Sequence, residues 1–159
     1  MDEKSLLEFI ARAHGNTYAA PKEIKFLYSC KIPILEKHKD YDFTDGDWRY
    51  HDSYAGSIWA PGREVVFYKG EPVWSMAYQG KTIDGLSEEL VDETFTFLKT
   101  ALINADERMP FRGPRAFAKG DFDYRFLMTG DYRYFTGEEA IAYKRTIIFT
   151  QNVMGILVK

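Results

Sequence analysis

Apolar residues recur with helical spacing in two segments of the chain. In residues 3–14 the shared face consists of Leu6, Phe9, Ile10 and Ala13. Residues 87–103 carry a longer stripe, made of Leu90, Val91, Thr94, Phe97, Leu98, Ala101 and Leu102. Ser87 stands where an N-cap belongs, and two glutamates follow it in the first turn. The spacing therefore predicts a short helix near the N-terminus and a main helix in the middle of the chain.

Alternation of apolar and polar residues predicts strands elsewhere. Trp48–Tyr54 alternates, and Glu64–Tyr68 with Val73–Tyr78 form a hairpin around Lys69-Gly70. Ile24–Tyr28 also fits a short strand between prolines. After the main helix, strands are expected near residues 122–128, 131–135, 139–143 and 146–153. Most of the chain outside the two helices is thus expected to form sheet.

The sequence contains one motif twice, in residues 43–80 and 117–155. One gap near Ile58 aligns the copies, with an offset of 74 before it and 75 after it. Ten positions are then identical: Phe43/Phe117, Gly46/Gly120, Asp47/Asp121, Tyr50/Tyr124, Gly56/Gly130, Gly62/Gly137, Glu64/Glu139, Tyr68/Tyr143, Lys69/Lys144 and Gly80/Gly155. We interpret the chain as two copies of an α-β(3–4) unit, residues 1–83 and residues 84–159.

Runs of strands that follow a helix are typical of an α+β fold with an antiparallel sheet. We expect two helices to pack on that sheet and the two copies to be related by a pseudo-twofold axis. At 159 residues the chain fits a single domain, residues 1–159.

Composition narrows the function classes. The net charge of −3 gives no electrostatic footprint for nucleic acid. A single cysteine, Cys30, rules out an internal disulfide, and the three histidines lack metal-ligand spacing, so neither a metal site nor a cofactor is expected. The N-terminus does not resemble a signal peptide, and no apolar run approaches the ~18 residues of a membrane span. We expect a cytoplasmic protein.

Comparison of the two copies singles out Asp52. Period two places it on one strand face with Trp48, Tyr50 and Tyr54, and the corresponding residues of the second copy are Phe122, Tyr124, Phe126 and Met128. Asp52 thus occupies a core-facing position whose counterpart is Phe126. A carboxylate there must be hydrogen-bonded, paired or shifted in pKa. It is either a polar anchor in a ligand pocket, a catalytic acid or base, or a structural Asp bonded to backbone.

Aromatic residues gather near Asp52 in this interpretation. Tyr50, Tyr54, Trp74 and Tyr78 form a dense group, and aromatic walls with one carboxylate suit a cationic or planar small molecule. The strand face that carries Trp74, Met76 and Tyr78 corresponds to Phe149, Gln151 and Val153, and such a stripe is more often core than a ligand cage. The predicted ligand-binding residues are Asp52, Tyr50, Tyr54, Trp74 and Tyr78.

Other polar residues receive structural interpretations. Glu64 and Glu139 recur at a strand start, which favours exposed or turn-stabilising carboxylates. Arg112 is expected in a solvated loop, and Cys30 as a small buried hydrophobe. His51 points away from Asp52 on a strand, so no His–Asp relay is expected. Signature motifs of the common enzyme classes are absent from the sequence.

Several phrases carry a resemblance in a consistent order: NTYA (16–19), GDWRYHDSYAG (46–56), PVWSMAYQG (72–80), PFRGP (110–114) and GDFDYRF (120–126). Together they resemble the bacterial domain of unknown function 5680 family over nearly the whole chain. In many members this domain follows an XRE-type helix-turn-helix module, so the resemblance implies a sensor or interaction role. The chain departs from the family pattern at Ala77 and in residues 34–38.

We therefore expect a non-catalytic binding module that senses a small molecule or docks a protein partner through an aromatic pocket around Asp52. One alternative is a small enzyme that uses Asp52 as a general acid or base, which would need a second converging polar group. Another is a structural module that forms a homodimer through a sheet edge or an exposed face.

Overall fold

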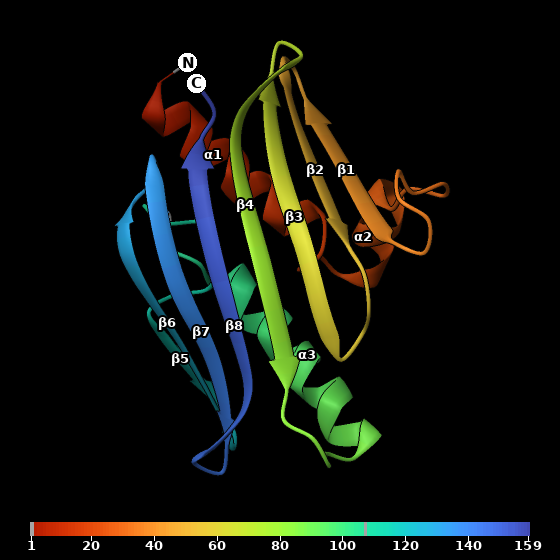
Figure 1. The fold of residues 1–159 in the computed structure, drawn as a ribbon, viewed down its shortest axis with the longest axis vertical. Helices are drawn as coiled ribbons and strands as arrows, with labels where there is room; N and C mark the ends of the chain where they lie inside the picture. Colours follow the sequence, from red (N-terminus) through yellow and green to blue (C-terminus); the bar gives the residue numbers. More distant parts are fainter. Residues whose placement is uncertain (1, 107) are drawn as a thin grey trace.

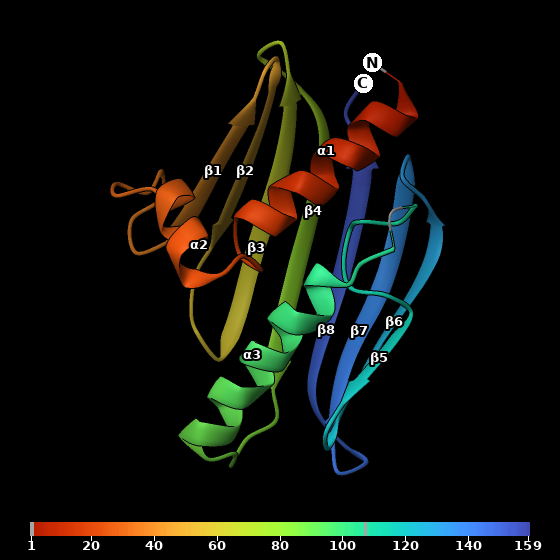
Figure 2. The same cartoon turned by 180° about the vertical axis from the view of Figure 1, so that it is seen from behind.

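The computed structural model describes residues 2–106 and 108–159. One antiparallel sheet of eight strands carries the helices α1, α2 and α3 on the same side, and α1 and α3 run across its face (Figures 1 and 2). The N- and C-termini lie side by side at one end of the sheet (Figure 1). The predicted α+β class with an antiparallel sheet is confirmed, with one helix more than expected.

The two predicted helices are present, with caps that the sequence provides. Helix α1 spans Glu3–Asn16, and the Asp2 side chain accepts a hydrogen bond from the Ser5 backbone N–H. Helix α3 spans Glu88–Ile103, and the Ser87 hydroxyl accepts from the Leu90 N–H. The α1 stripe is buried against the sheet, and so are Thr94, Phe97, Leu98, Ala101 and Leu102 of α3. Amphipathic spacing and capping together specify both helices.

The predicted strand at Ile24–Tyr28 is wrong, because these residues belong to helix α2, Lys22–Tyr28. Pro21 precedes the first turn, where a fixed φ and a missing N–H favour helix initiation. The chain pairs with the edge strand, residues 39–45, only after this helix, through an isolated antiparallel bridge between Ser29 and Tyr41. Tyr28 anchors α2 by packing edge-on against Phe43, with ring centroids 5.1 Å apart.

The strands form two four-stranded meanders that meet in the middle of the sheet. They are β1 (Lys39–Asp45), β2 (Trp48–Tyr54), β3 (Trp59–Tyr68), β4 (Glu71–Thr82), β5 (Ala116–Lys119), β6 (Phe122–Asp131), β7 (Tyr134–Tyr143) and β8 (Thr146–Leu157). Their order across the sheet is β1-β2-β3-β4-β8-β7-β6-β5. The strands expected near residues 131–135 and 139–143 are one strand, β7. The edge strands β1 and β5 were not predicted, although residues 40–44 of β1 alternate between polar and aromatic side chains; β5 has only 4 residues.

The two meanders share local backbone features. Lys69 and Lys144, in the turns that follow β3 and β7, both have positive φ, 52° and 48°. Each half also contains one shift of strand register, after Val66 in β3 and after Ile141 in β7. A left-handed conformation is uncommon for a non-glycine residue. Its occurrence in the corresponding turns of the two meanders is therefore a distinctive similarity between them.

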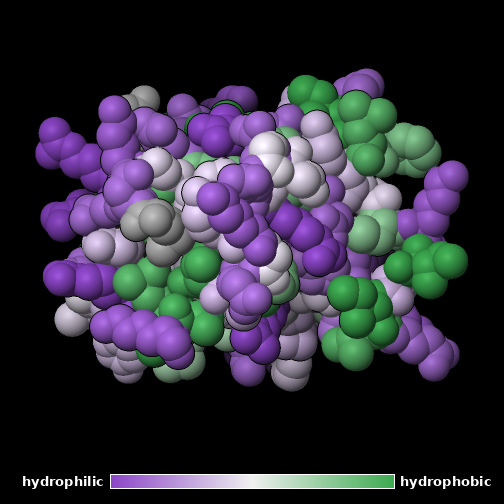
Figure 3. All heavy atoms as spheres, turned by 90° about the horizontal axis from the view of Figure 1, so that it is seen from above, coloured by the Kyte–Doolittle hydropathy of each residue, from purple (hydrophilic) through white to green (hydrophobic). Residues whose placement is uncertain are grey.

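The core lies between the sheet and the helices. The inward-facing residues of the two central strands are buried: Trp74, Met76, Tyr78, Phe149, Gln151 and Val153. Core placement of this stripe, as predicted, is confirmed. At the opposite extreme, the segment 24–35 exposes large apolar side chains, among them Phe26 at 74% and Ile32 at 88%. Figure 3 shows apolar atoms gathered on the side of the molecule that carries α2 and the loop after it.

Over residues 2–106 and 108–159, none of the helices has the length and apolar character needed to span a membrane.

Candidate functional site

A small cavity lies between the inner sheet face and the helices. Its walls come from β2, β3, β4 and β8, from α3, and from the end of α1 with the turn that follows it. The space open to the centres of water molecules is about 40 Å³. One water needs roughly 10–15 Å³ by this measure, so the cavity holds a few waters or a small chemical group. The candidate site is built around this cavity.

Asp52 lines the cavity from the middle of β2 and is 2% exposed. The Tyr78 hydroxyl donates to Asp52 Oδ1 at 2.8 Å, the one hydrogen bond that this carboxyl receives from the described residues. Its direct neighbour across the strand pair is Glu64 on β3. A second carboxyl thus opposes Asp52 in a water-poor environment, an arrangement that disfavours two negative charges.

The environment of Asp52 favours its neutral form. Burial raises the pKa of Asp52 well above its ordinary value, and the charge of Glu64 raises it further, while Tyr78 and Arg112 oppose the shift. Asp52 is therefore a protonated acid in conditions where an exposed Asp is ionised. In that state the carboxyl can donate a hydrogen bond to a group in the cavity as well as accept one.

Glu64 corrects a sequence-based prediction, because it is 3% exposed rather than a surface residue. Strand β3 begins at Trp59, so Glu64 lies in mid-strand, two residues before the buried Val66 and on the same face. Its carboxyl contacts His14 Nε2 at 2.8 Å and lies 4.0 Å from Arg112 Nη1. The end of helix α1 thus supplies a nitrogen donor to a carboxyl of the sheet.

Glu139 is also buried, at 1% exposure, where sequence analysis expected a surface residue. Arg112 Nε and Nη2 donate to its two oxygens at 3.2 and 2.9 Å. The Tyr124 hydroxyl donates at 2.5 Å and Gln151 Nε2 at 2.8 Å. Arg112 was expected in a solvated loop, but it is buried against the inner face of the sheet, where Glu139 compensates its charge. Within the described residues, Glu139 thus receives four side-chain hydrogen bonds, whereas Asp52 receives one.

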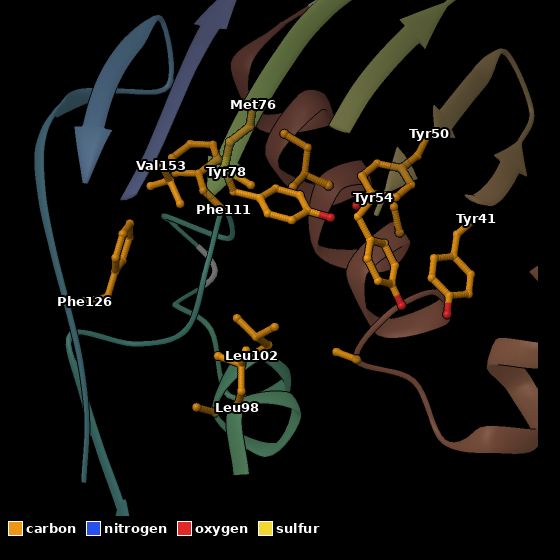
Figure 4. Close-up of a cluster of buried hydrophobic side chains, with 14 of the residues drawn as sticks. Tyr41, Tyr50, Tyr54, Met76, Tyr78, Leu98, Leu102, Phe111, Phe126 and Val153 are labelled. Atoms are coloured by element: carbon orange, nitrogen blue, oxygen red, sulfur yellow. The ribbon is translucent and has the colours of Figure 1, made fainter. Parts of the chain in front are cut away.

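Four of the five predicted ligand-binding residues line the cavity: Tyr50, Asp52, Tyr54 and Tyr78. Tyr78 extends from β4 toward the two β2 tyrosines (Figure 4). The fifth residue, Trp74, lies elsewhere in the core. It stacks on Phe111 at 5.6 Å, and its indole N–H donates to the Tyr132 carbonyl at 3.2 Å. Trp74 and Tyr78 lie four residues apart along one strand face. Over this length the sheet twists, so the two side chains contact different residues.

Histidine and cysteine residues lie outside the cavity, except His14. His51 contacts Asp42 at 3.1 Å and Asp40 at 3.4 Å on the opposite sheet face from Asp52, as expected. Cys30 is partly exposed rather than buried, because it lies in the loop after α2. Within residues 2–106 and 108–159, no three His, Cys, Asp or Glu side chains are grouped to hold a metal ion.

Sequence reasoning missed His14, Glu64 and Arg112, which line the same cavity as Asp52. A signal for Glu64 existed, since alternation from the core residue Val66 places it inward. Arg112 gave no local signal, because it lies in a loop without periodicity. Its position is set by the packing of the chain between α3 and β5 against the sheet, where Phe111 stacks on Trp74 and Arg112 pairs with Glu139.

Comparison with protein families gives one match, "Domain of unknown function (DUF5680)", over residues 52–158. The matched range includes Asp52, Glu64, Tyr78, Arg112 and Glu139, and leaves out α1 with His14. The searches of curated proteins and of solved structures gave no match. Because the matched residues cover more than half of the chain, in agreement with the resemblance of its motifs, the chain belongs to the domain of unknown function 5680 family.

Proposed function

We propose that this protein is a cytoplasmic binding module that senses a small molecule in the cavity around Asp52. The observation that carries the proposal is the state of Asp52: it faces a cavity, accepts one tyrosine hydrogen bond and has no backbone N–H donor among the described residues. A structural aspartate would be sealed by such donors. An open hydrogen-bonding position beside aromatic walls suits a small ligand. The sensor role implied by the family resemblance agrees with it.

The energetic cost of Asp52 supports a functional explanation. A buried acid opposite Glu64 disfavours folding at neutral pH, since the unfolded chain can ionise it freely. At the corresponding place in the second meander, Phe126 pairs with Glu139, as Asp52 pairs with Glu64. The fold therefore accommodates an apolar residue at this place. Departures from local optimisation are typical of functional sites.

We further propose that the two meanders are an internal duplication about a pseudo-twofold axis. The strand order, the register pairs and the turn conformations support it. Each half contains one buried glutamate that contacts a nitrogen group from outside the sheet. His14, near the end of α1, contacts Glu64, and Arg112, in the loop after α3, donates to Glu139. On this basis the second half is a closed copy of the site, and the first half retained the cavity.

The proposal is tested by a thermal-shift screen of small metabolites on the parent and on Ala19→Leu. Ala19 is buried and lines the cavity, so a leucine there fills the space. A ligand at 100 times its Kd stabilises the parent by about 2.7 kcal/mol. The filled variant is expected to lose this response. Ala77→Leu is the matched control, because Ala77 is exposed on the other sheet face.

Two outcomes would count against the cavity as the binding site. The first is a hit that stabilises the parent and Ala19→Leu equally. The second is a complete screen without any stabilising compound. A hit that depends on Ala19 and responds normally in Ala77→Leu supports the proposal.

A second candidate function, a small acid–base enzyme, is favoured by one observation. Asp52 and Glu64 face each other across adjacent strands, and their environments differ, since His14 and Arg112 surround Glu64. Paired carboxyls in unequal environments suit general acid and base roles. Incubation of a screening hit with the protein, followed by mass spectrometry, separates the two functions: conversion indicates an enzyme, and recovery of the unchanged compound indicates a binding module.

A further inference from the structure

Three lysines lie over the rings of three neighbouring tyrosines, two of which wall the cavity. Lys25 of α2 lies over the rings of Tyr18 and Tyr41, with Nζ 4.9 and 5.1 Å from their centroids. Lys99 of α3 also lies over Tyr18, at 5.4 Å. Lys39 at the start of β1 lies over Tyr54, at 5.6 Å. We name these three residues, Lys25, Lys39 and Lys99, the lysine rim.

The tyrosines connect the lysine rim to the cavity. Tyr18 and Tyr54 are cavity walls, and their rings meet edge to face with centroids 5.8 Å apart. Tyr41 stacks on Tyr54 at 6.2 Å. Two rings of the cavity wall, Tyr18 and Tyr54, therefore also lie against ammonium groups, although the three lysines do not line the cavity themselves. A molecule that reaches into the cavity past these rings passes close to the lysines.

The positive charge of the lysine rim is not compensated. Within residues 2–106 and 108–159, none of the three lysines is within ion-pair distance of a carboxylate. A tyrosine ring attracts a cation but carries no net charge, so three positive charges remain together. Burial, and then the charges of Lys99 and Lys39, together lower the pKa of Lys25 to about 8, against an opposing effect of Asp52. Burial also lowers the pKa of Lys99, and Lys39 adds to that shift while Asp92 opposes it.

Charge inside the cavity is arranged differently. Asp52 favours its neutral form, and the other carboxyl of the lining, Glu64, faces His14. Arg112, which also lines the cavity, is paired with Glu139 behind it. The interior thus has partners for its own charges, and the net excess lies at the lysine rim. A cationic ligand would approach three ammonium groups, which disfavours it, whereas an anion would relieve their repulsion.

We propose that the ligand of this cavity is a small organic anion whose carboxylate or phosphate group is held by Lys25, Lys39 and Lys99 while its uncharged part occupies the cavity beside Tyr18 and Tyr54. This inference rests on the proposed function and names its ligand class. The small cavity limits the inserted part to a few heavy atoms, and the protonated Asp52 with Tyr78 offers hydrogen bonds to an oxygen or nitrogen on it.

The test compares anions with uncharged molecules of the same shape. Acetate, butyrate and inorganic phosphate are titrated at low ionic strength, with acetamide and butyramide as neutral counterparts, and binding is measured by calorimetry and thermal shift. The variants are Lys25→Met, Lys39→Met, Lys99→Met and their combination, since methionine retains most of the stem over the rings. Lys119→Met on the exposed edge strand β5 is the control.

At least one of the two carboxylates is expected to bind the parent at least tenfold more tightly than its amide. The combined lysine variant should lose that preference, and Lys119→Met should keep it. Added salt should weaken binding, because the attraction is between charges. As an independent readout, the NMR resonance of the Lys25 ε-carbon should titrate near pH 8 in the free protein. Its midpoint should move upward when the anion is bound.

The outcomes separate this inference from the proposed function. Equal binding of carboxylates and amides, lost in Ala19→Leu but unchanged in the combined lysine variant, would overturn the anion class and leave the cavity as a binding site. No binding of any of these anions to the parent would also overturn it. Binding of phosphate alone, unaffected by Ala19→Leu, would show a surface anion site unconnected with the cavity and would contradict the inference.

Discussion

The buried carboxyl of Asp52 gives the protein a specific pH dependence of stability. Its pKa in the folded protein lies well above the 3.8 of an ordinary Asp, through burial and then through Glu64. Above about pH 4 the unfolded chain therefore releases a proton that the folded protein keeps. The free energy of unfolding must fall as the pH rises from about 4 toward the folded pKa, by up to about 1.4 kcal/mol per pH unit.

The substitution Asp52→Asn removes this contribution and keeps the shape of the side chain. An asparagine oxygen can still accept the Tyr78 hydrogen bond, and no proton is exchanged on unfolding. We expect the variant to become more stable relative to the parent as the pH rises from about 4 to about 7. Between about pH 4 and the folded pKa of Asp52, the gain should grow by about 1.4 kcal/mol for each pH unit, which is a tenfold change in the folding equilibrium.

Urea unfolding measures this difference, followed by tryptophan fluorescence at pH values from about 4 to about 7. The control is Asp84→Asn, because Asp84 is exposed and should not change the pH dependence. In a Glu64→Gln background the effect of Asp52→Asn should be smaller, since Glu64 contributes to the raised pKa of Asp52. Parallel pH curves for the parent and Asp52→Asn would show that Asp52 is ionised in the folded protein and would refute the reasoning.

Three further substitutions test the packing around the site. Leu98→Ala, at a position 2% exposed, should cost about 2–5 kcal/mol in urea unfolding, whereas Leu127→Ala, at 57% exposed, should cost within about 0.5. Arg112→Met should cost about 3–5 kcal/mol because it leaves Glu139 buried without its cation, and an added Glu139→Gln should recover part of the loss. Gly62→Ala places a Cβ 2.3 Å from the Tyr78 ring, so melting should show a loss of about 1–3 kcal/mol.

Secondary structure was predicted correctly from the sequence where local signals were strong. Helix α3 follows from its apolar stripe and from Ser87, and β2 follows from strict alternation. The edge strand β1 and helix α2 were not predicted correctly, because their conformation depends on which segment reaches the free edge of β2. Local patterns do not record that competition between segments.

The candidate site could be predicted only in part. Asp52 was found because its counterpart Phe126 shows that the position faces the core. Glu64 was wrongly predicted to be exposed, because a glutamate that recurs in both halves was interpreted as a surface residue. The recurrence instead reflects two buried glutamates with nitrogen partners. The contacts of His14 and Arg112 join residues 50 and 27 positions apart, and no sequence period encodes such distances.

The claim that the cavity around Asp52 binds a small molecule is tested most directly by a crystal structure of the protein with its strongest screening hit. The account predicts electron density for the compound inside the cavity, with a polar atom within hydrogen-bond distance of Asp52 or the Tyr78 hydroxyl, and with any acidic group near Lys25. Density for the compound at another surface, with only water beside Asp52, would contradict it.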